Sequence, residues 1–559
     1  MDAERGATGT RDVVIDIALL LVAWAAIVAL VDPRGDFPLN DDWAYAGSVQ
    51  MLRDEGVFRL PGWASMTLIT QTVWGVLVTA IAGFSYTALR ASTLVLGGAS
   101  LVATYLLARR MRAARAVAVL AALVLAANPL FIVLAHSFMT DVPMLALTLY
   151  ALLAFGRALQ SGSRLAWGVG TLITIAAVLC RQPGLTLAMG FVATAILRQP
   201  DRRRWLVLGV VSLLLGAGAL WGYQVVMEAF GPPLGEAYSR HVGFLQRLWQ
   251  MGPSGALPFL VGNLFVALLY AGLFLLPLLI VGAASGLAQR RAWWRGYWAI
   301  ALAALVIGAL SLWSSGRPLP MRANVLIESG LGPITLNDLY IRDIHNDPRL
   351  PPAFWWAATV VGVVAAALLV AQGLTVAARI WRERTSVAAP AAPVRALLFA
   401  NTLLYLSSAC VAIQFDRYFM PLVPLLGLAL LPTDTGRAAP RWTWLIAALP
   451  LVLLAAYGVA GTHDYLAWNR ARWEALQQLQ RDGVEARHID GGLEFNAPLF
   501  YVEGTTSGGG GRSWWWVADD EYMVTMGPVP GFDVERRVPY SRWLPPGEAA
   551  MTVLHRTRR

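Results

Sequence analysis

Long apolar runs are the feature that most constrains how this chain can fold. Runs of roughly 17–25 apolar residues recur along most of its 559 residues, and a helix of that length crosses a lipid bilayer. The composition agrees, because 57% of the residues are hydrophobic, only 14% are charged, and the mean hydropathy is +0.56. A soluble protein carries about a quarter charged residues. The sequence therefore predicts an α-helical membrane protein.

The basic residues indicate how the helices are threaded. The net charge is +10, and every basic residue is an arginine. The arginines gather in short loops between apolar runs, which is the pattern of cytoplasmic loops and not of a nucleic-acid-binding face, so we expect no nucleic-acid partner. The two cysteines, Cys180 and Cys410, lie in apolar runs without CxxC spacing, which argues against a disulfide scaffold or a zinc site.

If all the arginine loops face the cytoplasm, the runs between them pair into about thirteen spans. The N-terminus is then inside, the C-terminus is outside, and the first run is an anchor and not a cleaved signal. The predicted spans are 13–31, 87–108, 116–135, 142–159, 165–180, 184–198, 205–226, 258–283, 296–313, 353–377, 396–414, 418–434 and 442–460.

One further apolar run conflicts with this threading. Residues 68–84 could cross, but a crossing there would place the Arg109–Arg115 cluster outside. Four arginines in a short loop outweigh one run of borderline length. We therefore expect helices that lie on or dip into the outer leaflet within a first periplasmic loop, residues 32–86. The predicted transmembrane domain is residues 1–460.

The remaining residues, 461–559, differ in character and predict a small periplasmic α/β domain. Tyr465–Asp482 has helical spacing of its apolar residues and is followed by Gly483. Strand-like segments follow at 486–490, 497–502 and 551–555.

Two acidic runs stand where apolar helices end. The first is Asn40-Asp41-Asp42-Trp43-Ala44-Tyr45, and the second, from His136 to Pro143, contains Asp141. A charge inside hydrocarbon is costly, so these carboxylates belong at the membrane boundary. Their flanks are aromatic and apolar, unlike those of ordinary loop charges. This setting suits an enzyme whose substrate is half lipid and half water-soluble.

These runs resemble motifs of the GT-C glycosyltransferases that use polyprenyl-phosphate sugars, in particular the bacterial aminoarabinose transferase that modifies lipid A and the protein O-mannosyltransferases. Asp41-Asp42 with Tyr45 corresponds to their acidic pair and aromatic in the first outer loop. Thr140-Asp141 corresponds to their Asp after the third span, and Arg417-Tyr418 to a basic-aromatic pair before a proline-rich span. The resemblance covers about residues 1–460 and implies a GT-C fold. One departure is the Leu60–Trp63 stretch, where the aminoarabinose group has a Glu-Lys-Pro-Pro run tied to metal and phosphate binding.

The expected roles follow from this chemistry. A phosphate leaving group needs little acid catalysis, but the acceptor hydroxyl needs a base, and the departing phosphate needs positive charge. The family pattern favours Asp41 as the base, with Asp42 or Asp141 orienting it or the acceptor. Arg181 and Arg417, with Arg90 as a further candidate, lie at outer span ends where a lipid phosphate would sit. Tyr45, His136 and Tyr418 complete the expected substrate-binding residues.

Each role has a simpler alternative. The aspartates could cap helices, and the arginines could be interfacial anchors. His241 and His345 could join a divalent metal, although solvated loop histidines are commoner; no cofactor is certain and the metal ligands are unknown. Asp338, Asp343 and Asp347 could line an acceptor cleft, and the Trp514–Trp516 run could stack on sugar.

The resulting prediction is a glycosyltransferase of the bacterial inner membrane, with its active site and C-terminus in the periplasm. It would move a sugar from a polyprenyl-phosphate donor to a glycan, lipid or protein acceptor. The alternatives are a lipid or sugar transporter and a non-catalytic scaffold. A transporter typically shows repeated halves and ionisable residues near the midplane, and neither is apparent in this sequence.

Overall fold

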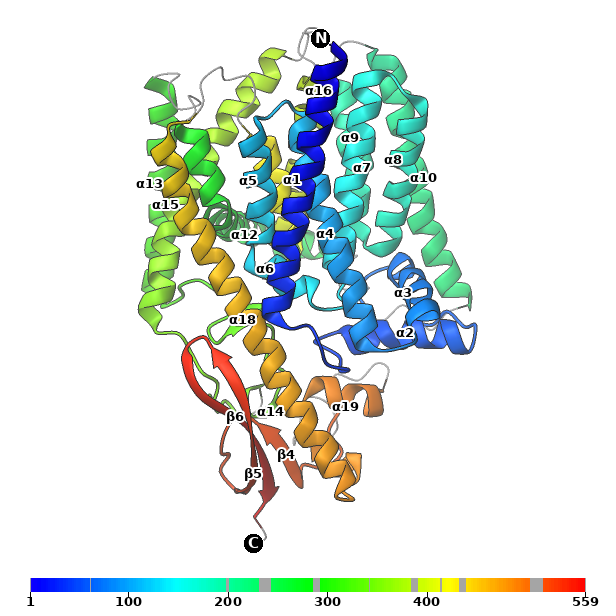
Figure 1. Cartoon of the computed structure of the whole chain (residues 1–559), viewed down its shortest axis with the longest axis vertical. Coiled ribbons are helices and arrows are strands. Elements are labelled where there is room, and N and C mark those ends of the chain that lie inside the picture. Colours follow the sequence, from blue (N-terminus) through cyan, green and yellow to red (C-terminus); the bar gives the residue numbers. More distant parts are fainter. Residues whose placement is uncertain are drawn as a thin grey trace.

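The protein is a helical bundle with a small sheet at one end (Figure 1). The computed structural model describes residues 2–60, 62–197, 201–230, 243–284, 292–340, 342–383, 391–412, 415–431, 439–502 and 516–557. The N-terminus lies at one end of the long axis, and the C-terminal domain lies at the other. We call the end of the bundle next to the C-terminal domain the domain end.

Eight described helices are long and apolar enough to cross a membrane, or nine if a bent pair counts as one span. The eight are α1 (Asp2–Val31), α4 (Tyr86–Arg110), α7 (Asp141–Ser161), α10 (Arg202–Phe230), α12 (Phe244–Gly282), α15 (Pro352–Glu383), α16 (Ala392–Val411) and α18 (Arg441–Arg481). The bent pair is α5 (Arg115–Ala126) with α6 (Pro129–Ala135), at 62°. The predicted total of thirteen also needs the shorter helices α8 (Arg164–Cys180), α9 (Leu185–Leu197), α13 (Ala292–Ser314) and α17 (Leu422–Ala429) to cross, and it stays a prediction.

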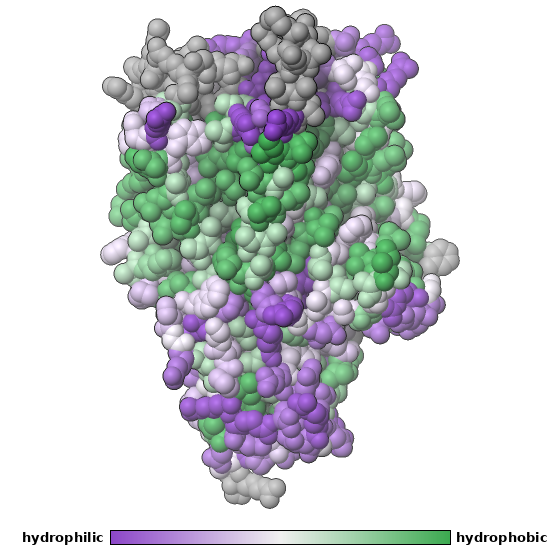
Figure 2. Space-filling view, in the orientation of Figure 1, coloured by the Kyte–Doolittle hydropathy of each residue, from purple (hydrophilic) through white to green (hydrophobic). Residues whose placement is uncertain are grey.

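The surface confirms the membrane setting. Figure 2 shows a hydrophobic band across the visible face of the helical bundle, with hydrophilic residues at both ends and over most of the C-terminal domain. Apolar side chains on the outer helices are widely exposed; Leu19, Leu214, Ile307 and Leu445 are examples. In water such a band would be unstable, whereas lipid covers it without cost. The chain is therefore a multi-pass membrane protein.

Two helices of the first long loop lie at the domain end. Helix α2 (Asp42–Asp54) runs across the long axis of the bundle, with α3 (Ile69–Ala82) beside it (Figure 1). Helix α3 has 14 residues and is about 21 Å long, which is less than the roughly 30 Å of a hydrocarbon core. This arrangement agrees with the expected helices at the membrane boundary.

The bend between α5 and α6 has a local cause. Pro129 lacks the N–H that would continue α5, and the side chain of Asn128 caps α6 by accepting a hydrogen bond from the Phe131 N–H, at 3.0 Å. Helix α6 then ends after seven residues, and His136 takes the C-cap position. Residues 136–140 therefore form a tight corner before α7.

The C-terminal domain contains a four-stranded sheet with the order β3-β4-β6-β5. The strands are β3 (Ile489–Asp490), β4 (Tyr522–Thr525), β5 (Phe532–Trp543) and β6 (Pro546–Arg556), and only the β3–β4 pair is parallel. Helix α18 continues from the bundle to pack against β5, so the predicted boundary after residue 460 falls inside one continuous helix. Its end at Arg481, before Gly483, is as predicted.

One predicted strand is wrong, and the one predicted at 486–490 is confirmed only at Ile489–Asp490, because Ala486–His488 form the short helix η4. Residues 497–502 were expected to be extended, but α19 (Leu493–Phe500) is helical up to Phe500. Tertiary contacts decide the conformation, because the buried Glu494 at the start of α19 pairs with Arg472 of α18. The Asn496 side chain also bonds the backbone of Ile489 and Gly491, which fixes the turn into the helix.

Candidate active site

Asp41 links the first loop to Arg417, which lies far away in the sequence. It precedes α2 in the N-cap position, but its side chain makes no capping hydrogen bond. The Trp63 indole N–H donates to Asp41 Oδ1 at 2.8 Å, and Arg417 Nη1 lies 3.4 Å from Oδ2. Capping alone therefore does not account for Asp41.

Asp42 has a different environment. It is buried, accepts the Phe138 N–H at 3.0 Å through Oδ2, and has no described partner for Oδ1. Burial raises the pKa of Asp42 to about 7. The bond to Phe138 fastens the start of α2 to the 136–140 corner, and Gln71 of α3 adds a second bond to the Phe138 carbonyl.

Asp141 and Arg181 form a second ion pair with little solvent exposure. Asp141 is the first residue of α7, and Arg181 follows the last residue of α8. Their side chains are 2% and 10% exposed, and the Arg181 guanidinium donates to Asp141 Oδ1. An arginine that only anchored the chain at the interface would extend its guanidinium into water, which this one does not.

Tyr418 lies between the two arginines. It belongs to the short helix η3 (Asp416–Phe419), and its ring is 5.2 Å from Arg181 Cζ and 5.7 Å from Arg417 Cζ. Arg417 Nε is buried without a described partner. The two ion pairs and Tyr418 thus form one cluster, which we call the Asp–Arg cluster: Asp41, Asp141, Arg181, Arg417 and Tyr418.

Of the other two predicted substrate-binding residues, only Tyr45 is described beside this cluster. Tyr45 is buried, donates to Met66 Sδ at 3.0 Å, and is close enough to interact electrostatically with all four charged members. His136 is directed elsewhere. Its Nδ1 lies 2.7 Å from the Ile132 carbonyl, so it carries the proton, and its ring packs near Trp24 of α1.

Arg90, which was expected at headgroup level, has a structural role. It is 1% exposed, and its guanidinium donates to the carbonyls of Pro33, Gly35 and Phe37. Arg90 thereby holds the segment between α1 and α2, which leads directly to Asp41.

A small cavity of about 60 Å³ adjoins the cluster. Arg181 and Tyr418 line it, together with Ser65, Met66, Gln182, Pro183, Tyr405, Ser408, Ala409 and Ala412. The first loop forms one wall and the end of α16 another. The cavity therefore connects the Asp–Arg cluster with the junction of several helix ends.

Part of the chain that carries this cluster is similar to a known family. Residues 74–226 match a family model described as dolichyl-phosphate-mannose-protein mannosyltransferase. The resemblance to GT-C glycosyltransferases is confirmed. The matched segment contains Asp141 and Arg181, begins after Asp41 and ends before Arg417.

A solved oligosaccharyltransferase from Archaeoglobus fulgidus, tethered to an acceptor peptide with the NVT sequon, is also similar. The identity is 15% and the TM-score is 0.42, with 84% of this chain and 57% of that chain covered. The chain thus spans little more than half the length of that protein. No curated protein matches this chain.

The GT-C resemblance did not indicate two residues that support the cluster. Asp416 is fully buried and accepts hydrogen bonds from the backbone N–H groups of Val325, Leu326 and Arg417. It fixes the helix that carries Arg417 and Tyr418. Its position beside that pair was the only sequence signal for it.

Glu494 is the second. It accepts the Asn40 N–H at 3.1 Å, and its other oxygen accepts from Thr335 and Arg472. Asn40 has a positive φ of 55°, so its backbone needs an external restraint next to Asp41. Nothing in the sequence indicated that residue 494 would reach residue 40.

The C-terminal domain also contributes aromatic rings. Trp516 is 3% exposed and packs edge-on against Trp63, at 5.4 Å between centroids, and Tyr501 packs against Trp43 at 5.5 Å. Trp516 therefore supports the indole that bonds Asp41. Trp514 and Trp515, and the loop histidine His241, lie outside the described residues.

The residues fit a metal ion poorly at the Asp–Arg cluster, because two guanidinium groups already neutralise its carboxylates. Among the described residues, one triad could hold a divalent metal: His488, Asp519 and Glu521, with one ligand atom each within 4.8 Å of the others. It lies in the C-terminal domain, and Arg556 also donates to Asp519 at 2.8 Å. His345 instead lies beside Asp343, at 2.9 Å.

Proposed function

We propose that this chain is an integral-membrane glycosyltransferase that moves a sugar from a polyprenyl-phosphate donor to an envelope glycan, lipid or protein. The observation that carries the proposal is the Asp–Arg cluster. Two carboxylates and two arginines meet around one tyrosine at the domain end, and the family match includes two of these five residues, Asp141 and Arg181.

The cluster suits the two halves of the reaction. The arginines supply N–H donors for the phosphate, including the unpartnered Nε of Arg417. Asp41 is the base, because its side chain is 14% exposed, whereas that of Asp141 is 2% exposed and Asp42 is buried. Asp141 holds Arg181, and Asp42 holds the corner next to it.

The proposed step is a single displacement with inversion. The acceptor oxygen forms a bond to the anomeric carbon and gives its proton to Asp41. The bond between that carbon and the phosphate oxygen breaks, and polyprenyl phosphate departs as an anion beside Arg181 and Arg417. This uses general-base catalysis and electrostatic stabilisation, without general-acid help for the leaving group.

We place the protein in a bacterial inner membrane, with the domain end in the periplasm. The support is the distribution of arginines. Arg109, Arg110, Arg112 and Arg157 all lie at helix ends opposite the Asp–Arg cluster, as cytoplasmic loops require.

The test is transfer by purified protein in liposomes, with a panel of polyprenyl-phosphate sugars and an envelope extract as acceptor. We expect labelled sugar in the acceptor and release of polyprenyl phosphate for at least one donor. Asp41→Asn should slow both by roughly 100- to 10,000-fold, whereas Asp54→Asn, at the exposed end of α2, should not. Movement of the intact donor between leaflets without sugar transfer would support the transporter alternative and refute the proposal.

A further inference from the structure

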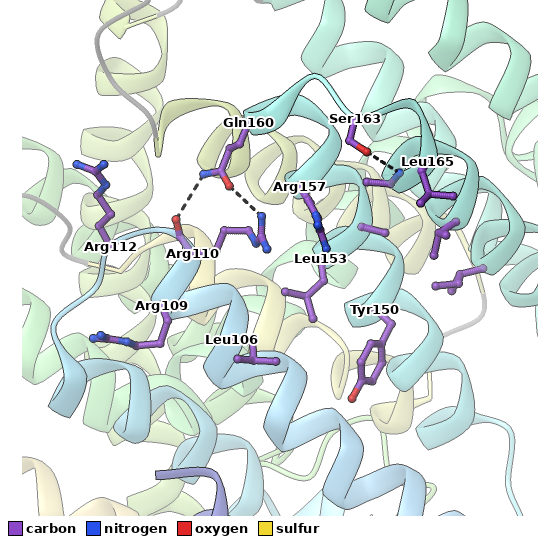
Figure 3. A pocket seen from close by; sticks show the side chains of 14 residues that line it. Leu106, Arg109, Arg110, Arg112, Tyr150, Leu153, Arg157, Gln160, Ser163 and Leu165 are labelled. Atoms are coloured by element: carbon purple, nitrogen blue, oxygen red, sulfur yellow. Dashed lines mark hydrogen bonds between the residues drawn. The ribbon is translucent and has the colours of Figure 1, made fainter. Parts of the chain in front are cut away.

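A large cavity lies at the opposite end of the bundle from the Asp–Arg cluster. It has a volume of about 810 Å³, which is within the usual range for ligand pockets, and it is formed by α4, α7 and α8 (Figure 3). Arg109, Arg110, Arg112 and Arg157 line its polar part. The proposed transfer reaction uses none of these residues.

The four arginines have no ion-pair partner among the described residues. Gln160 accepts from Arg110 Nη1 at 3.1 Å, and the Ala113 carbonyl accepts from Arg109, but no carboxylate lines the cavity. Arg110 and Arg157 are near enough to repel each other electrostatically. In contrast, Arg115, in the same loop region, is neutralised by Asp12 and Asp16. Among the described residues, no acidic side chain therefore lines the cavity to compensate these charges, and only Asp16, outside the lining, is near enough to Arg109 to interact with it electrostatically.

Deeper in the bundle than the arginines, the cavity is lined by apolar side chains. On α4, Leu106 lies about one turn deeper in the bundle than Arg110, and on α7, Leu153 lies about one turn deeper than Arg157. On α8 the wall runs from Leu165 through Val169 to Ile173, with steps of four residues and a length of about 12 Å.

This wall is open to the surrounding lipid. Leu165 is 80% exposed and Val169 is 42% exposed, although both belong to an apolar helix of the bundle. A soluble anion such as a nucleotide would leave these side chains without a partner. A molecule with a phosphate and an acyl chain would use both parts of the cavity.

We propose that this cavity binds an acidic phospholipid of the bilayer, with its phosphate between Arg110 and Arg157 and an acyl chain along Leu153, Val169 and Ile173. The inference is independent of the proposed sugar transfer. Arginines that only set the orientation of the protein in the membrane must lie in the loop, but they need not line a cavity with an apolar wall. Each arginine near a lipid headgroup contributes attraction that corresponds to about a fivefold change in affinity.

The experiment is native mass spectrometry of the purified full chain with equal amounts of phosphatidylglycerol and phosphatidylcholine of identical acyl chains. We expect preferential phosphatidylglycerol adducts. The double variant Arg110→Gln/Arg157→Gln should lose roughly 30-fold in affinity for this lipid. Arg164→Gln is the matched control, because Arg164 is an exposed arginine at the start of α8 that does not line the cavity.

A second arm tests the apolar wall and the source of the phosphate. Ala154→Phe should obstruct the site of the acyl chain and reduce phosphatidylglycerol binding, although the arginines remain. The melting temperature of each variant shows whether it is folded. Equal binding of the two lipids, or an equal loss in Arg164→Gln, would overturn the proposal. Displacement of the lipid by inorganic phosphate, or stronger binding of a polyprenyl monophosphate, would also overturn it.

Discussion

Asp41 and Asp42 are adjacent in sequence but differ in environment, so matched amide variants should separate their roles. Asp41→Asn keeps the hydrogen bond from Trp63 but cannot accept a proton, and we expect turnover to fall by roughly 100- to 10,000-fold with donor binding nearly intact. Asp42→Asn should reduce turnover less. Single-turnover transfer and donor binding measure both. A near-normal rate in Asp41→Asn would remove it from the mechanism.

Arg417 should matter mainly for the donor. Arg417→Ala removes a cation with 6% side-chain exposure, and the lost charge-assisted bond should cost about 1.5–3 kcal/mol, which is roughly a 10- to 150-fold rise in KM for the donor. Arg317→Ala is the control, since Arg317 is exposed in the segment that follows α13 and is not part of the Asp–Arg cluster. Unchanged donor affinity in Arg417→Ala would argue that Arg417 is only an interfacial anchor.

The raised pKa of Asp42 predicts a pH-dependent stability difference. Because the folded protein holds this proton up to about pH 7, whereas the unfolded chain releases it near pH 4, the folded state binds more protons between these values. The contribution of Asp42 to stability therefore falls as pH rises from 4 to 7. We expect the melting temperature of Asp42→Asn, relative to that of the unsubstituted protein, to rise across that range. A constant difference between the two melting temperatures would contradict the raised pKa of Asp42.

At the scale of elements, the position of the first loop depends on contacts from the C-terminal domain. Glu494 bonds Asn40, Trp516 packs against Trp63, and the Trp473 ring of α18 stacks on Phe37 at 6.3 Å. Arg90 adds a clamp from α4. The loop that carries the proposed base is thus held by contacts from α4, α18 and α19 and from Trp516.

Glu494 offers a direct test of this support. Glu494→Ala removes the restraint on Asn40 and leaves the buried Arg472 unpaired, a change that typically costs about 3–5 kcal/mol. We expect a lower melting temperature and faster tryptic cleavage at Arg34 or Arg53 of the first loop. Glu535→Ala, at an exposed position of β5, should cleave at the normal rate. Equal cleavage in both variants would contradict a bracing role.

At the scale of the whole molecule, the distribution of arginines predicts the threading through the membrane. The two native cysteines are buried, so single introduced cysteines can report on each end. We expect Arg112→Cys to resist an impermeant thiol reagent in intact cells and Glu535→Cys to react, because the arginine loops face the cytoplasm. Ready labelling of Arg112→Cys from outside would reverse the orientation and contradict the thirteen-span prediction.

The sequence by itself was sufficient for the features that a bilayer enforces locally. In hydrocarbon every backbone N–H and C=O must be bonded within its own helix, so run lengths and arginine loops predict where helices such as α4, α7 and α16 lie. The end of α18 before Gly483 was predictable for a similarly local reason. The candidate residues Asp41, Asp141, Arg181 and Arg417 came from motifs at the ends of such runs.

Only the tertiary structure decided which of these residues meet. Arg417 reaches Asp41 across 376 positions, and Glu494 reaches Asn40 across 454. Residues 497–500 are helical and His136 packs near Trp24, and neither feature could be predicted from the local sequence. Hydrophobic run length carries no information about which helix ends adjoin, because that depends on side-chain packing and on pairing buried charges between segments far apart in the chain.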